Sequence, residues 1–238
     1  MNKIFAFLLL LCSLSAHAES PLKGTWQQKF PDGRTATLLC SENYLMLAEY
    51  HFIQKKYFRS AGGTYQLSKI GQKKVISFKK DFNTQDPMTA GTTIATLYTL
   101  VNNVLSVQQG PLAGTWQKVV ETGTSNLAGN WRLKAKEDAN FVMQTQLKGS
   151  LKTIKLLTKQ YFHEVSFNID TQQFFTSFGG TYSQKNKKYY EKINFNAMIP
   201  KQAGQSFEYD FILNGTDWLH ARQSNKGERV NEVWERIE

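Results

Sequence analysis

The sequence predicts an all-β protein made of two consecutive small antiparallel up-and-down barrels. Three observations predict this fold: apolar and polar residues alternate with a period of two, short turn sequences separate the alternating runs, and the whole pattern occurs twice. Residues 189–195 show the alternation, and residues 31–33 (Pro-Asp-Gly), 102–103 (Asn-Asn) and 214–215 (Asn-Gly) are turn sequences between strand-like runs. After the first 18 residues, no long stretch has the periodicity of an amphipathic helix.

Residues 1–18 have the features of a cleaved secretory signal peptide. Lys3 gives the positive start, residues 4–11 the apolar stretch, and residues 16–18 (Ala-His-Ala) the small-residue cleavage site. The apolar run is too short to span a membrane. We therefore expect export to the periplasm or the outside, and a mature chain of 220 of the 238 residues without a transmembrane segment. That chain retains one cysteine, Cys40, which excludes an internal disulfide.

The mature chain contains two copies of one unit. The landmarks are the openings Gly-x-Trp at Trp26 and Trp131, the Gly-Gly-Thr-Tyr sequences at residues 62–65 and 179–182, and the closing Trp116 and Trp234. Tyr44 and Tyr161 each precede the tyrosine of the second landmark by 21 residues. Phe82 and Phe195 are each followed at equal distances by a proline and an Ala-Gly pair. This ordered series of matches indicates an internal duplication.

The duplication sets the domain boundaries. We assign residues 19–120 to the first barrel and residues 127–238 to the second. The second copy has 12 more residues between its opening tryptophan and the matched tyrosine, enough for one additional hairpin. The short polar junction favours two units in contact, an internal pseudo-dimer. Eight strands of about 8 residues with turns of about 3 need roughly 90 residues, which fits each unit, and closure removes exposed sheet edges.

The Gly-x-Trp openings, together with the closing residues 234–236 (Trp-Glu-Arg), resemble the lipocalin-like (calycin) pattern and that of short secreted bacterial lipocalin-like proteins of unassigned function. The resemblance implies a barrel in each half whose opening tryptophan plugs one end under a basic side chain. Trp26 would then lie under Lys118, and Trp131 under Arg236. The resemblance also implies non-covalent binding of a small hydrophobic or amphipathic molecule in a barrel cavity, without catalysis.

Six aromatic residues at matched positions are the candidate ligand contacts. They are Tyr44, Phe58, Tyr65, Tyr161, Phe175 and Tyr182. In an apolar pocket, tyrosine hydroxyls or a basic side chain at the mouth would orient the polar end of a ligand. The alternative is that the tyrosines are core residues. The adjacent glycine pairs likewise have two interpretations: they bend a strand at a barrel corner, or they let a ligand approach the backbone.

The sequence offers no motif for other chemistry. Hydrolase-elbow, zinc-protease and phosphate-loop motifs are absent, and the three mature histidines are not spaced as a metal site, so we expect no catalytic residue, metal or cofactor. The net charge of +10 is spread as lysine pairs, which indicates a solvated face or contact with an anionic surface. Export disfavours nucleic acid as a partner. Two alternatives stay open: an envelope interaction module that binds a protein or an anionic surface through its outer faces, and an enzyme that uses Glu49 or Glu164 at a barrel mouth.

Overall fold

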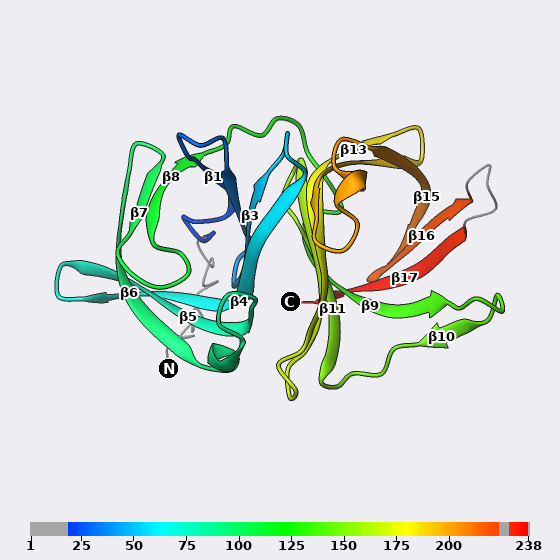
Figure 1. The fold of residues 1–238 in the computed structure, drawn as a ribbon, viewed down its shortest axis with the longest axis horizontal. Coiled ribbons are helices and arrows are strands. Elements are labelled where there is room, and N and C mark those ends of the chain that lie inside the picture. Colours follow the sequence, from blue (N-terminus) through cyan, green and yellow to red (C-terminus); the bar gives the residue numbers. More distant parts are fainter. Residues whose placement is uncertain (1–18, 224–228, 238) are drawn as a thin grey trace, which may run out of the picture.

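Each half of the chain forms its own antiparallel β-barrel, and the two barrels lie side by side (Figure 1). The computed structural model describes residues 19–223 and 229–237. The predicted all-β fold with two consecutive barrels is confirmed. Within those ranges, no helix has the length and apolar character needed to cross a membrane. The predicted signal peptide, residues 1–18, lies outside the described residues.

The first barrel is closed by eight strands in chain order. They are β1 (Gly24–Lys29), β2 (Thr35–Cys40), β3 (Tyr44–His51), β4 (Lys56–Ile70), β5 (Lys73–Asn83), β6 (Thr93–Val101), β7 (Val104–Val107) and β8 (Gly114–Lys118), with a short 3-10 turn, η1 (Pro87–Thr89), after β5. Each strand pairs with the next, and β8 returns to β1, where Lys118 lies opposite Trp26. The closed arrangement leaves no unpaired sheet edge.

The second barrel repeats this topology with one addition. Its elements are β9 (Gly129–Glu137), β10 (Met143–Thr145), β11 (Leu151–Leu157), β12 (Tyr161–Asn168), β13 (Phe174–Lys185), β14 (Lys188–Asn196), η2 (Pro200–Gln202), β15 (Ser206–Asn214), β16 (Asp217–Gln223) and β17 (Arg229–Ile237). β9 pairs with β11 on one side and with β17 on the other, which closes the barrel. The residues by which the second copy is longer include β10, which forms a hairpin with the end of β9, as the sequence predicts.

The repeated glycine pairs lie at matching bulges in β4 and β13, where the pairing register shifts between the two glycines. A Cβ atom on Gly63 would lie 2.0 Å from the carbonyl oxygen of Lys79. On Gly180 it would lie 1.9 Å from the carbonyl oxygen of Lys192. The backbone of the neighbouring strand therefore requires glycine here, which supports the strand-bending interpretation over close approach of a ligand.

The two barrels pack through a pseudo-twofold interface. Tyr57 of β4 stacks on Phe174 of β13, its own counterpart in the second copy, with the ring centroids 6.3 Å apart. Ser60 and its counterpart Ser177 likewise meet, with their hydroxyl oxygens 3.0 Å apart. Contacts between identical positions are what a twofold axis produces. The predicted internal pseudo-dimer is therefore what the structure contains.

Contacts away from this axis occur in reciprocal pairs. The rings of Phe82 and Phe167 are 5.0 Å apart, and the rings of their counterparts Phe195 and Tyr50 are also 5.0 Å apart. A buried apolar cluster joins the barrels and comprises Leu39, Tyr44, Met46, Phe82, Ile154, Leu156, Val165 and Phe167. Strand β3 consequently has one face in the lumen and the other in this interface, so every residue of it is buried.

We expect His163 to destabilise the fold at acidic pH. Its Nε2 lies 2.7 Å from the Ser177 hydroxyl, and burial lowers the pKa of His163 to about 3. The unfolded chain takes up this proton near pH 6.5 and the folded chain only near pH 3, so stability is lost as the pH falls below about 6.5. At pH 4 this histidine should cost about 3 kcal/mol of unfolding free energy. Urea unfolding at pH 7 and pH 4 should show a smaller acid loss for His163→Gln than for wild type. Equal acid losses in wild type and His163→Gln would show that His163 is not the group responsible.

Candidate functional site

The six aromatic residues predicted as ligand contacts do not converge on one cavity. Tyr65 lies in the apolar core of the first barrel and Tyr182 in that of the second. Tyr44 and Tyr161 belong to the apolar cluster between the barrels. Phe58 and Phe175 are exposed. These six residues therefore do not line one common ligand pocket.

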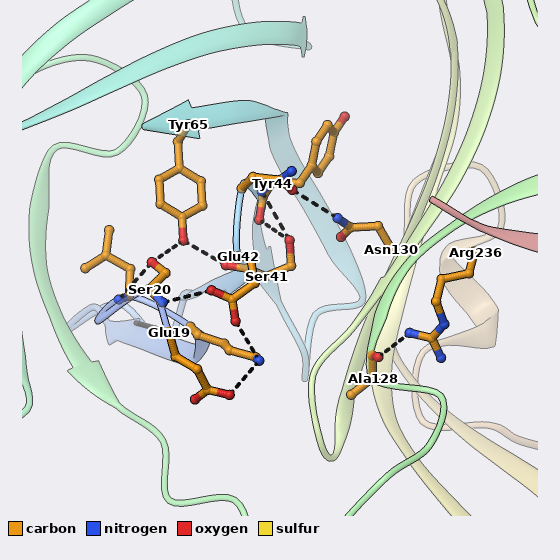
Figure 2. A network of polar contacts seen from close by, with 12 residues as sticks. Glu19, Ser20, Ser41, Glu42, Tyr44, Tyr65, Ala128, Asn130 and Arg236 are labelled. Atoms are coloured by element: carbon orange, nitrogen blue, oxygen red, sulfur yellow. Dashed lines mark hydrogen bonds and ion pairs between the residues drawn. The ribbon is translucent and has the colours of Figure 1, made fainter. Parts of the chain in front are cut away.

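The hydroxyl groups of Tyr65 and Tyr182 are occupied by equivalent protein partners. Tyr65 donates to the carbonyl oxygen of Ser41 at 2.7 Å, and its oxygen lies 2.6 Å from the hydroxyl of Ser20 (Figure 2). Tyr182 donates to the carbonyl oxygen of Thr158 at 2.6 Å and lies 2.7 Å from the serine hydroxyl that precedes its own barrel. Each tyrosine therefore connects the segment before the first strand of its barrel with a hairpin turn, the β2–β3 turn in the first barrel and the β11–β12 turn in the second.

Each barrel-opening tryptophan lies beneath a basic side chain from the last strand of its own barrel. The Lys118 ammonium is 4.4 Å from the ring centroid of Trp26, and the Arg236 guanidinium is 4.3 Å from that of Trp131. Lys118 also donates to a backbone carbonyl, and Arg236 donates to two, at 2.6 and 2.7 Å. A lysine thus occupies in the first barrel the position that arginine occupies in the second. Partial burial lowers the pKa of both groups.

A groove of about 1050 Å³ lies between the barrels, next to these two cations. Counterpart residues of the two copies line it: Gly24 and Gly129, Ser41 and Thr158, Lys118 and Arg236. Its apolar lining comprises Cys40, Val119, Val120, Ala128, Leu157 and Ile237. Figure 2 shows side chains of both barrels approaching it, with Glu42 from the first and Arg236 from the second. The groove therefore lies on the pseudo-twofold axis and requires both copies.

The basic side chains along the groove differ in whether they form salt bridges. Lys23 pairs with Glu19 at 3.1 Å and with Glu42 at 2.7 Å. In the part of the chain that the structure describes, Lys118 and Arg236 donate to carbonyl oxygens and have no carboxylate within ion-pair distance. Two cations without a salt bridge among the described residues thus border the apolar part of the groove, and Glu121, which also lines it, favours the charged form of Lys118. That combination suits the polar end of an anionic amphipathic molecule.

The structure also contains a charged cluster that the sequence analysis missed, in the lumen of the second barrel. Lys155 Nζ lies 2.9 Å from Glu191 Oε1 and 3.1 Å from Glu164 Oε2. The available signal was the alternation in β11: Ile154 and Leu156 face the interface, so Lys155 between them must face the lumen.

The two carboxylates of the enzyme interpretation have different surroundings. Glu49 is buried in the first barrel between Arg34 and Arg59, with Arg59 Nε 2.7 Å from its Oε2. Glu164 is buried in the second lumen, and burial raises its pKa to about 7. Within the described residues, no three His, Cys, Asp or Glu side chains are grouped so as to hold a metal ion.

Comparisons with known proteins give one family match, to the second copy, and a distant similarity to a solved structure. Residues 126–238, the second copy, match the family described as Domain of unknown function (DUF4488). No curated protein matches the chain. Among solved structures, a lipocalin-like protein from Bacteroides uniformis is similar, with 14% identity and a TM-score of 0.34 over 48% of this chain and 100% of that chain. The chain thus consists of two consecutive antiparallel barrels, and the second copy matches an uncharacterised domain family.

Proposed function

We propose that this protein is a non-enzymatic binding protein that holds a small amphipathic molecule in the groove between its barrels. The observation that carries the proposal is the groove itself, because its volume of about 1050 Å³ is of the size that small-molecule sites have. Export, expected from residues 1–18, is part of the same proposal. The groove replaces the lumen of the first barrel as the favoured site, since Leu38, Leu47 and Phe78 fill that lumen.

The lining of the groove indicates which end of the ligand lies where. The hydrocarbon part would bury against Val119, Leu157 and Ile237. A carboxylate at the other end would receive charge-assisted hydrogen bonds from Lys118 or Arg236, whose charges have no ion-pair partner among the described residues. The net charge of +10 would further attract anions to the protein. A long-chain monocarboxylate combines these properties.

Dodecanoate should bind saturably and change the tryptophan fluorescence, because Trp26 and Trp131 lie directly beneath the two cations. Val120 lines the groove and is 85% exposed, so Val120→Glu should leave folding intact while repelling a carboxylate. We expect this variant to weaken dodecanoate binding about tenfold. Fluorescence titration of wild type and variant measures the effect.

The matched control is Val101→Glu, which adds the same charge at a site that is 62% exposed and lies at the end of β6, outside the groove lining. It should keep the wild-type affinity. A titration without saturation, or equal affinities in Val120→Glu and wild type, would contradict the groove as a carboxylate site. Salt-sensitive retention on anionic vesicles without uptake of dodecanoate would instead favour the interaction module.

A further inference from the structure

The lumen of the second barrel is charged at positions where that of the first is apolar. Lys155, Glu164 and Glu191 occupy the places of Leu38, Leu47 and Phe78. The correspondence follows from strand register, since Leu38 pairs with Leu47 across β2 and β3, and Lys155 pairs with Glu164 across β11 and β12. The first barrel closes with apolar residues at these positions. The fold therefore does not require the charges.

The charges are deeply buried, so their desolvation makes the free energy of folding less favourable. Lys155 and Glu191 are nearly inaccessible to solvent, and the Tyr189 hydroxyl donates to Glu191 at 3.0 Å. Removing ions from water costs more than their mutual attraction returns unless every contact is well made. A costly arrangement that the sister barrel does without points to a role in binding.

The same lumen holds two polar atoms without partners. His220 Nδ1 lies 3.3 Å from Glu232 Oε2, so with the proton on Nδ1 the imidazole donates to this carboxylate and keeps Nε2 as an acceptor. Among the described residues, His220 Nε2 and Trp218 Nε1 have no hydrogen-bond partner, although these residues are only 2% and 0% exposed. The two residues are two positions apart on β16 and thus share a face. Their ring centroids are 5.1 Å apart, so the rings that carry the unpaired acceptor and the unpaired donor are neighbours.

Three carboxylates, those of Glu164, Glu191 and Glu232, surround the buried ammonium of Lys155 in the lumen. Lys136 pairs with Glu232 from the surface, and Arg222, on the same face of β16 as His220, lies over the rings of Phe207 and Tyr209. Burial and the carboxylates of Glu232 and Glu191 raise the pKa of Glu164 to about 7, against the lowering effect of Lys155. A further cation beside Glu164 would stabilise its ionised form.

The lumen also provides aromatic walls and access. The ammonium of Lys155 lies 5.1 Å from the ring centroid of Trp234 and 5.3 Å from that of Trp218, so these rings already face a cation. Glu164 is 8% exposed, whereas its counterpart Leu47 is 0% exposed. Solvent therefore reaches part of the Glu164 side chain, which is 11% exposed, unlike the same position in the first barrel.

We propose that the lumen of the second barrel binds a small organic cation, a primary amine that also carries a hydrogen-bond acceptor. Its ammonium group lies against Glu164 and donates to His220 Nε2, and its acceptor takes the N–H of Trp218. This site is separate from the groove between the barrels and takes a ligand of opposite charge, so it goes beyond the proposed function.

Three probes of similar size and shape test the chemistry: 2-phenoxyethylamine (cation), 2-phenoxyethanol (neutral) and phenoxyacetate (anion). Calorimetric titration of the whole protein at pH 8, where Glu164 is largely ionised, should show saturable one-to-one binding of the amine. We expect the amine to bind at least tenfold more tightly than the alcohol and phenoxyacetate not to bind in the lumen. Absence of saturable amine binding up to millimolar concentration would overturn the proposal and leave the unpaired atoms as water sites.

Variants locate the binding. Glu164→Gln removes the charge and keeps the shape, and should weaken amine binding at least tenfold. Glu208→Gln, at an exposed carboxylate on β15, is the matched control and should bind the amine as wild type does. Dodecanoate titration of Glu164→Gln shows that the variant is folded and that the groove is intact. Wild-type amine affinity in Glu164→Gln would overturn the proposal, and loss of amine binding in Val120→Glu would place the amine in the groove instead.

Discussion

Replacing Lys155 with methionine should lower the free energy of unfolding by about 3–5 kcal/mol. The substitution keeps much of the side-chain volume but removes the ammonium that lies 2.9 Å from Glu191 and 3.1 Å from Glu164. Those two carboxylates then remain buried without their cation, which is the costliest way to alter a buried ion pair. Urea unfolding at pH 7, followed by tryptophan fluorescence, measures the loss.

The triple variant Lys155→Met, Glu164→Leu, Glu191→Leu is the matched comparison. It gives the second lumen the apolar character that the first barrel has at Leu38, Leu47 and Phe78. Because this variant removes all three charges together, none of them remains buried without a partner. Its unfolding free energy should equal that of wild type or exceed it by about 1–4 kcal/mol. It should also fail to bind 2-phenoxyethylamine. A triple variant as unstable as the single one would show that the cluster holds the barrel together.

Substituting Gly180 with alanine should cost more than about 3 kcal/mol or prevent the second barrel from closing. The new Cβ would lie 1.9 Å from the carbonyl oxygen of Lys192 and 2.8 Å from the amide nitrogen of Asn194. Both contacts are with backbone, which cannot move without breaking the β13–β14 pairing. Urea unfolding measures the loss if the variant folds, and circular dichroism of the purified protein detects a failure to fold.

Gly149→Ala is the control for this substitution, because a Cβ there would have no atom within 4 Å. It should change the unfolding free energy by less than about 0.5 kcal/mol. A Gly180→Ala variant as stable as Gly149→Ala would mean that the bulge relaxes easily, and the strand-bending explanation of the glycine pair would be wrong.

The features that could be predicted from sequence are those encoded locally or by repetition. Alternation and turn residues indicate strands because each depends on neighbouring residues only. The duplication follows from matched landmarks such as residues 62–65 and 179–182, and the extra hairpin of the second copy from a difference in spacing. These observations were sufficient for the all-β class, the two barrels and their contact.

The direction of each side chain was decided by the tertiary structure alone. Strand β3 is buried on both faces, one in the lumen and one against the second barrel, so its hydrophobic pattern does not distinguish them. A shift of one residue exchanges the two faces. Tyr44 and Tyr161, predicted as ligand contacts, accordingly lie between the barrels, and Tyr65 and Tyr182 use their hydroxyls to hold their own barrels.

The sequence by itself thus determined what is built, two copies of a closed antiparallel barrel, because periodicity and turn chemistry are local. Only the tertiary structure decided which residues form the two proposed sites. The groove joins Val119 with Leu157 and Ile237, and the charged lumen joins Lys155 with Glu191 and Glu232. Such residues are distant along the chain and meet only after strand pairing and barrel packing have brought them together, so no local pattern records their proximity.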